Sequence, residues 1–127
     1  MKRVVVAVQN YLVSEAILSA LKRRGICAEK SFSCEPNEIA SLCDMLFADV
    51  LVMDVTRFNE GSYNNRTEIV NVVKKSSLQI KVCLICDNVS DEELSFKVLN
   101  AKKLGLIDMF FYQSVPSDYI ADMISTM

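Results

Sequence analysis

Two cysteines of this 127-residue chain, Cys83 and Cys86, have the C-x-x-C spacing that redox pairs and zinc sites use. Both lie in residues 80–86, an apolar run that we predict to be a β-strand. Positions i and i+3 of a strand point to opposite faces, so the two thiols cannot easily share a metal or a disulfide. The chain has no histidine, so a zinc site would need four of its five cysteines to converge. We therefore interpret both as buried structural thiols.

The full set of cysteines indicates a compartment. There are five of them, an odd number, and all lie in or beside apolar runs; the other three are Cys27, Cys34 and Cys43. This usage fits reduced, buried thiols better than a disulfide framework. We expect a cytoplasmic protein without a signal peptide.

The remaining motifs do not indicate an enzyme or a cofactor site. No glycine-rich turn, Walker-type loop or Ser/Thr-rich phosphate loop accompanies the apolar runs. The net charge is −2, and the basic clusters stand at the ends of predicted helices, where they complement the helix dipole. The longest apolar stretches have about six to eight residues, too few to cross a bilayer. We expect a non-catalytic protein with no cofactor and no direct contact with nucleic acid or membrane.

Short apolar runs alternate with helical patterns along the whole chain. We predict strands at residues 3–8, 26–32, 50–53, 80–86 and 106–112. We predict helices at residues 12–24, from Pro36 to Leu46 and from Pro116 to Ile124. A further helix begins at Ile69, after a polar loop over residues 56–65. Another begins at a capping box formed by Ser90 and Glu93 and ends at Gly105. Five successive βα units require right-handed crossovers and a parallel sheet covered on both faces. The expected fold class is α/β, a three-layer doubly wound sheet built by a single domain, residues 1–127.

Asp54 directly follows the central apolar run, within the segment ADVLVMDV at residues 48–55. This segment resembles the third strand of response-regulator receiver domains, which ends in the aspartate that accepts a phosphoryl group. The resemblance extends to VQNYLVSEAILSAL (8–21), KVCLICD (81–87) and FFYQSVPSDYIADMI (110–124). It implies the flavodoxin-like, CheY-like strand order 2-1-3-4-5, with two helices on one face and three on the other. It also places Asp54 at the phosphoacceptor position.

The chain departs from the receiver pattern around this position. The two adjacent acids that hold Mg²⁺ in the family are replaced by Val8 and Gln9. Cys86 replaces the hydroxyl residue that ends strand four, and Gln113 replaces the lysine that ends strand five. Phosphoryl transfer depends on positioning and on charge neutralisation, which the family achieves with the residues missing here. The resemblance therefore predicts an atypical, degenerate receiver whose Asp54 is not functionally phosphorylated.

Two roles for Asp54 stay open in the sequence. In the first, it is a relic or a structural acid that accepts hydrogen bonds from nearby backbone amides. In the second, Asp87 and Glu60 replace the missing carboxylates and rebuild a Mg²⁺ site, with Asp54 and the Thr56 carbonyl as weak ligands. The second role would make the chain a phosphoacceptor of a two-component system or phosphorelay.

The resemblance also implies partners. The chain most resembles receivers of transcription regulators that carry a helix-turn-helix output domain. Residues 1–127 contain no such domain, so this hypothesis expects the output domain in a longer polypeptide. We expect a homodimer through residues 90–105, 106–112 and 116–124, with an output domain or a sensor kinase as further partners. Phe110 falls at the family's aromatic switch position, and we expect its ring to be packed permanently because Cys86 is a weak hydrogen-bonder. Other aromatic residues of this region are Phe111, Tyr112 and Tyr119.

Overall fold

A computed structural model describes residues 2–57, 61–77, 79–87 and 91–127. Five strands alternate with five helices along these residues: β1 (Arg3–Ala7), α1 (Tyr11–Arg23), β2 (Cys27–Lys30), α2 (Pro36–Leu46), β3 (Val50–Asp54), α3 (Tyr63–Ser76), β4 (Lys81–Cys86), α4 (Glu92–Lys103), β5 (Met109–Tyr112) and α5 (Ser117–Ser125). None of the helices is both long and apolar enough to cross a membrane, as far as the described residues go.

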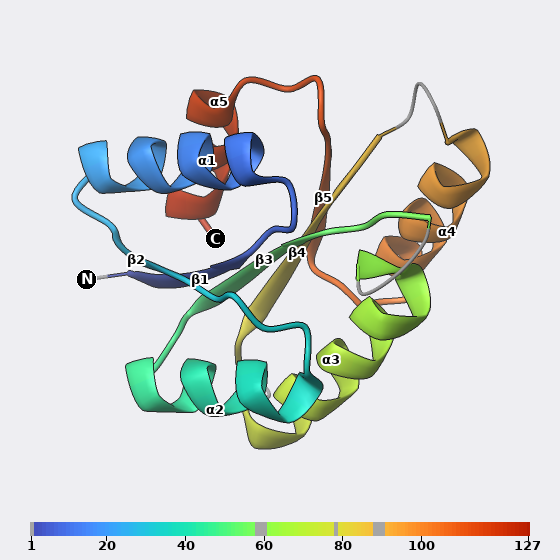
Figure 1. The fold of residues 1–127 in the computed structure, drawn as a ribbon, viewed down its shortest axis with the longest axis horizontal. Helices are drawn as coiled ribbons and strands as arrows, with labels where there is room; N and C mark the ends of the chain where they lie inside the picture. The colour runs from blue at the N-terminus through green and yellow to red at the C-terminus, as the bar shows by residue number, and fades with distance from the viewer. Residues whose placement is uncertain (1, 58–60, 78, 88–90) are drawn as a thin grey trace.

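The strands form one parallel sheet in the order β2-β1-β3-β4-β5, which confirms the predicted topology. Helices α1 and α5 cover one face of this sheet, whereas α2, α3 and α4 cover the other (Figure 1). The chain places β2 on one side of β1 and then places β3 on the other side, so the order in which strands are added reverses between β1 and β3. In such a fold, ligands bind outside the carboxyl ends of the strands at this point, where Asp54 ends β3.

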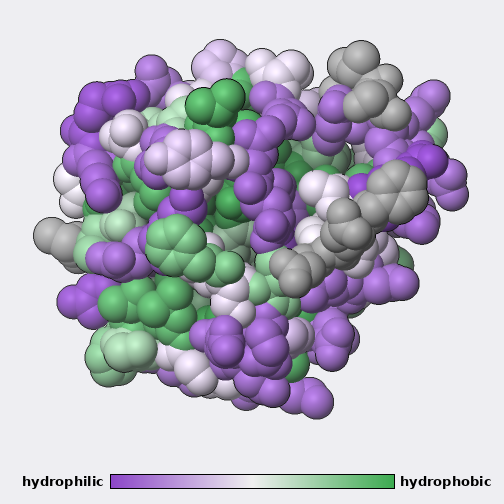
Figure 2. Space-filling view, in the orientation of Figure 1, coloured by the Kyte–Doolittle hydropathy of each residue, from purple (hydrophilic) through white to green (hydrophobic). Residues whose placement is uncertain are grey.

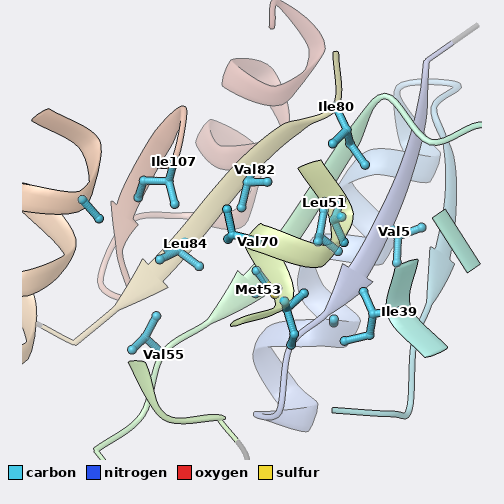
Figure 3. Packing of buried hydrophobic residues seen from close by; sticks show 14 of the residues in the cluster. Val5, Ile39, Leu51, Met53, Val55, Val70, Ile80, Val82, Leu84 and Ile107 are labelled. Atoms are coloured by element: carbon cyan, nitrogen blue, oxygen red, sulfur yellow. The ribbon is translucent and has the colours of Figure 1, made fainter. Parts of the chain in front are cut away.

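Two hydrophobic layers hold the sheet between its helices. Val5, Leu51, Met53 and Leu84 point toward α2, α3 and α4 (Figure 3). The alternate positions of the same strands, such as Val6, pack against α1 and α5. This pattern explains why β1, β3 and β4 read as continuous apolar runs in the sequence, since both of their faces are buried.

The cysteines partly match their prediction. Cys83 packs in the layer under α1 and α5, and Cys86 packs in the opposite layer, which confirms that the C-x-x-C residues face apart. Cys43 is also buried. The prediction of burial was wrong for Cys27, which is exposed, and for Cys34, which is half-buried. Cys27 lies on the sheet edge, where β2 has no further strand beside it.

Two helix starts differ from the sequence prediction. Helix α3 begins at Tyr63 instead of Ile69, because Ser62 caps it by accepting a hydrogen bond from the Asn65 N–H at 3.2 Å. Helix α4 is capped by Asp91, whose carboxylate accepts from the Leu94 N–H at 3.1 Å. The expected cap, Ser90, lies outside the described residues. Strand β5 is also shorter than predicted and begins at Met109.

The central strand should dominate the stability of the fold. Leu51 is fully buried in β3, so Leu51→Ala should lower the free energy of unfolding in urea by about 2–5 kcal/mol. Leu104→Ala, at a side chain that is 77% exposed, is the control and should change it by less than about 0.5 kcal/mol. Equal effects of the two substitutions would contradict the assignment of the core.

Candidate functional site

Asp54 is held by the start of helix α1. Its Oδ1 accepts a hydrogen bond from the Gln9 N–H at 2.9 Å, and its Oδ2 accepts one from the Asn10 N–H at 3.2 Å. Asn10 in turn caps α1 by accepting from the Val13 N–H. The carboxylate therefore joins the carboxyl end of β3 to the β1–α1 connection, through backbone amides of the kind that the first role expects.

A buried arginine is the second partner of Asp54. The Arg66 side chain is fully buried, and its Nη2 donates to Asp54 Oδ1 at 3.1 Å. The same guanidinium donates from Nε to the Asp54 carbonyl at 2.7 Å and from Nη2 to the Ala7 carbonyl at 3.1 Å. Its Nη1 donates to Asn65 Oδ1 at 3.4 Å. One cation thus connects β1, β3 and α3 at the carboxyl edge of the sheet.

The early start of α3 brings Arg66 to this position. The Thr56 N–H donates to the Gly61 carbonyl at 2.7 Å, so the connection from β3 closes on itself just before the helix. A Cβ at Gly61 would lie 2.9 Å from Thr56 Oγ1, so a larger residue at this position would require the Thr56 side chain to shift. Arg66 then falls in the first helical turn, facing the sheet.

Sequence reasoning missed Arg66, although a signal for it was present. The buried face of α3 consists of Arg66, Ile69, Val70 and Val73, which follow the spacing of one helical stripe. The apolar members of this stripe predict a helix from residue 69, which left position 66 between the polar loop and the helix. Extending the period back by three residues predicts that position 66 is buried.

Two cavities share Thr56 as a lining residue, and one of them, of about 310 Å³, opens beside Asp54. Its walls are formed by Gln9, Asn10, Val13, Asp54, Val55, Thr56, Ile85 and Gln113. Among these lining residues, Asp54 is the single charged group, and its charge is balanced from below by Arg66. The cavity therefore offers neutral amides where the receiver pattern has acids and a lysine.

The other substituted positions lie around this cavity or behind it. Gln9 and Gln113 line it, and the Gln113 N–H donates to the Cys86 carbonyl at 2.8 Å. Val8 and Cys86 are buried in the two hydrophobic layers instead. Burial raises the pKa of the Cys86 thiol to about 11, with the Asp87 carboxylate adding to the effect, so this group stays a neutral thiol.

The structure describes the candidate residues of a rebuilt metal site only in part. Asp87 is half-buried and is not one of the lining residues, and Glu60 lies outside the described residues. Thr56 does line the cavity, next to Asp54. Within the described part of the chain, no group of three or more acidic or cysteine side chains is placed to hold a metal ion.

A second ion pair closes the neighbouring part of this edge. Arg57 donates to both carboxylate oxygens of Asp91 at 2.7 Å, which ties the residues after β3 to the start of α4. The Arg57 guanidinium lowers the pKa of Asp91 to about 2; desolvation opposes this shift, and the Leu94 N–H assists it. Both residues of the pair line the second cavity, of about 290 Å³, together with residues at the starts of α3 and α4.

The predicted aromatic surface is only partly exposed. Phe110 is half-buried and meets Tyr112 edge-on, with ring centroids 5.6 Å apart. Both rings pack against the layer under α2, α3 and α4, whereas Phe111 is buried on the opposite face and so is not a surface residue. Tyr119 is 52% exposed, so it remains available for contacts.

Comparison with solved structures identifies the fold. No protein-family model and no curated protein sequence matches the chain. A CheY-like protein, TadZ of Pseudomonas aeruginosa, is 18% identical with a TM-score of 0.77, over 99% of this chain and 98% of that one. The response regulator TrrA of Thermotoga maritima, solved in complex with Mg²⁺ and BeF, is 16% identical with a TM-score of 0.72, over 99% and 98% of the chains.

A third structure comes from a family of streptococcal redox sensors described as having evolved from two-component response regulators. It is 10% identical with a TM-score of 0.77, over 99% of this chain and 50% of that one. At these identities the comparisons establish the fold, which is that of response-regulator receiver domains.

Breaking the Arg66–Asp54 pair should strongly destabilise the protein. Arg66→Met removes the cation that pairs with the Asp54 carboxylate and donates to two backbone carbonyls, so we expect a loss of about 3–5 kcal/mol in the free energy of unfolding. The double variant Asp54→Asn/Arg66→Met should lose less than the sum of the two single variants. Additive losses in urea denaturation would show that the two side chains do not interact.

The second pair predicts a dependence on pH. The pKa of Asp91 is about 2 in the folded chain and about 3.9 in the unfolded chain. The contribution of the ion pair to the free energy of unfolding is therefore complete above about pH 4 and is lost as the pH falls through about 2. The difference in unfolding free energy between the natural chain and Asp91→Asn should be constant from about pH 5 to 7 and shrink below about pH 4. A difference that persists unchanged to pH 2 would contradict this pairing.

Proposed function

We propose that this chain is an atypical receiver domain that works in signal transduction through protein contacts, without phosphorylation of Asp54. One observation carries the proposal: Arg66 is a permanent internal partner of Asp54, and the cavity beside it contains no other charged lining residue. In this proposal the domain is non-catalytic and needs no cofactor. Its output is the regulation of an attached or associated domain, such as a DNA-binding domain.

The chemistry of phosphoryl transfer supports this proposal. The transferred group carries negative charge on its oxygens, and a receiver needs a cation on that side of the acceptor to stabilise it. Arg66 contacts Asp54 from the buried side, through Oδ1 and the backbone carbonyl. The cavity side presents Gln9, Asn10 and Gln113, which cannot neutralise charge or bind Mg²⁺ as carboxylates do.

The alternative function is a phosphoacceptor with a rebuilt Mg²⁺ site. The observation in its favour is that Asp54 lines an open cavity at the carboxyl edge of the sheet. It would require Asp87 or Glu60 to supply a carboxylate to the same cavity.

Helix α4 supports the dimer part of the proposal. It carries Glu92 and Glu93 in its first turn and Lys102 and Lys103 in its last turn. Two copies related by a two-fold axis, with their α4 helices antiparallel, would bring opposite charges together at both ends. The exposed side chains of Leu104 and other apolar residues nearby would add contact area.

The acidic residues of α5 are less available for such an interface. Asp118 and Asp122 form ion pairs with Arg23 and Arg24 of α1, at 2.8–3.4 Å. The arginines lower the pKa of Asp118, so it stays charged and paired. We therefore propose that α4 supplies the complementary charges across the dimer interface. Because Phe110 packs against the core and has no phosphorylated partner to respond to, the interface would be constitutive.

Incubation with acetyl phosphate and Mg²⁺ tests the absence of phosphorylation. Intact-protein mass spectrometry at neutral pH should show no stoichiometric gain of about 80 Da, the mass of one phosphoryl group. The matched control is Asp54→Asn, whose mass profile should be the same as that of the natural chain. An adduct that is present in the natural chain and lost in Asp54→Asn would establish the alternative function.

Sedimentation tests the dimer. The natural chain should associate as its concentration is raised, and Lys102→Glu/Lys103→Glu should weaken association because it places four acids on one helix. The control is Lys75→Glu on the exposed end of α3, which should have no effect. A monomer at every concentration, or equal effects of both variants, would rule out the α4 interface.

A further inference from the structure

Large hydrophobic side chains are exposed beside the edge strand β2. Phe32, in the connection from β2 to α2, is 88% exposed, and Tyr11, the first residue of α1, is 65% exposed. This connection leads from the edge of the sheet to the α2 layer of the fold (Figure 1). Figure 2 shows apolar surface between these two layers on the face toward the viewer. Exposed apolar surface of this kind marks interaction sites in soluble domains.

Both aromatic rings contact the same ammonium group. Lys30 Nζ lies 4.4 Å from the centre of the Tyr11 ring and 5.2 Å from that of the Phe32 ring. Glu15 Oε1 lies 3.7 Å from the same nitrogen, and the Lys30 side chain is only 16% exposed. These three residues, Tyr11, Lys30 and Phe32, form an aromatic clamp whose positive charge is already balanced within the chain.

The segment that carries Phe32 is anchored at both ends. The Ser31 N–H donates to the Val6 carbonyl at 2.9 Å, which extends the pairing of β2 with β1. The Asn65 side-chain amide donates to the Cys34 carbonyl at 3.0 Å, and the Gln9 side chain contacts Cys34 Sγ. Phe32 is therefore presented to solvent by an ordered segment. An ordered aromatic side chain loses little entropy on binding a partner.

Three carboxylates lie close to Phe32 in the sequence. Glu29 precedes Lys30 in β2, and Glu35 and Glu38 stand at the start of α2; all three are exposed. Within the described residues, no basic side chain forms an ion pair with any of the three. Together with Glu15, four carboxylates accompany one ammonium group, so the surface attracts positive charge.

We propose that the aromatic clamp and the acidic rim of Glu29, Glu35 and Glu38 form a docking surface for a basic, apolar segment of a partner protein. The open face of Phe32 is suited to stacking with an arginine or lysine side chain of that segment, and the rim attracts its neighbouring charges. The apolar residues of the partner would cover Tyr11 and Phe32. The proposal does not rest on the α4 interface or on the state of Asp54.

Titration of the ¹⁵N-labelled chain with two synthetic peptides tests this surface. One is an amphipathic helix built of lysine and leucine, and the other has glutamate in place of every lysine. The lysine peptide should shift the amide resonances of Tyr11 and residues 29–38 saturably, whereas the glutamate peptide should not. Phe32→Ala should weaken binding of the lysine peptide about fivefold or more, since truncating a central aromatic contact typically costs this much.

The matched control is Phe96→Ala, which removes an exposed aromatic ring from α4 and should leave the affinity unchanged. Phe32 is largely exposed, so its variant should fold normally, and its amide spectrum verifies this. Three outcomes would overturn the proposal: shifts centred away from residues 11 and 29–38, equal binding of both peptides, or equal affinities of Phe32→Ala and the natural chain. Absence of binding at about millimolar peptide would overturn it as well.

Discussion

The carboxyl edge of the sheet depends on one buried ion pair. Arg66 and Asp54 bring together a charge from α3 and a charge from β3; the Arg66 guanidinium is fully buried, and only 10% of the Asp54 side chain is exposed, toward the cavity. Burying an isolated guanidinium would be very unfavourable, so its carboxylate and carbonyl partners must be present at the same time. The pair therefore fixes the position of α3, the end of β3 and the start of α1 relative to one another.

This arrangement changes what the fold can do. A receiver switches because its acceptor carboxylate is free to gain a phosphoryl group and thereby new partners, which shifts a population between two states. Here the acceptor position already has its partners, from two backbone amides and a guanidinium. The same edge extends through Gln9 and Asn65 to Cys34, so the ion pair also supports the segment that presents Phe32. The proposed function, a domain that works without phosphorylation, rests on these contacts.

The sequence predicted the sheet well because its strands are buried on both faces, and the runs at β1, β3 and β4 cannot be confused with amphipathic helices. It located Asp54 and the replaced residues around it for the same reason, since each ends or follows such a run. It missed Arg66 because a charged residue in an apolar stripe looks like the boundary of that stripe. Only the three-dimensional closure at Gly61 places that arginine under the sheet edge. The start of α4 was misplaced because Ser90 and Asp91 are both good caps, and the contact with Arg57 favours Asp91.

The most direct test of the ion pair is the exchange of arginine side-chain protons with solvent, measured by ¹⁵N NMR at neutral pH. Arg66 and Arg57 both donate to a carboxylate, but the Arg57 side chain is 53% exposed and that of Arg66 is fully buried. We expect a persistent Arg66 Nε–H resonance that exchanges far more slowly than that of Arg57. Exchange of Arg66 at the rate of an exposed arginine would contradict the buried ion pair, because it would place the guanidinium in solvent and leave Asp54 without its cation.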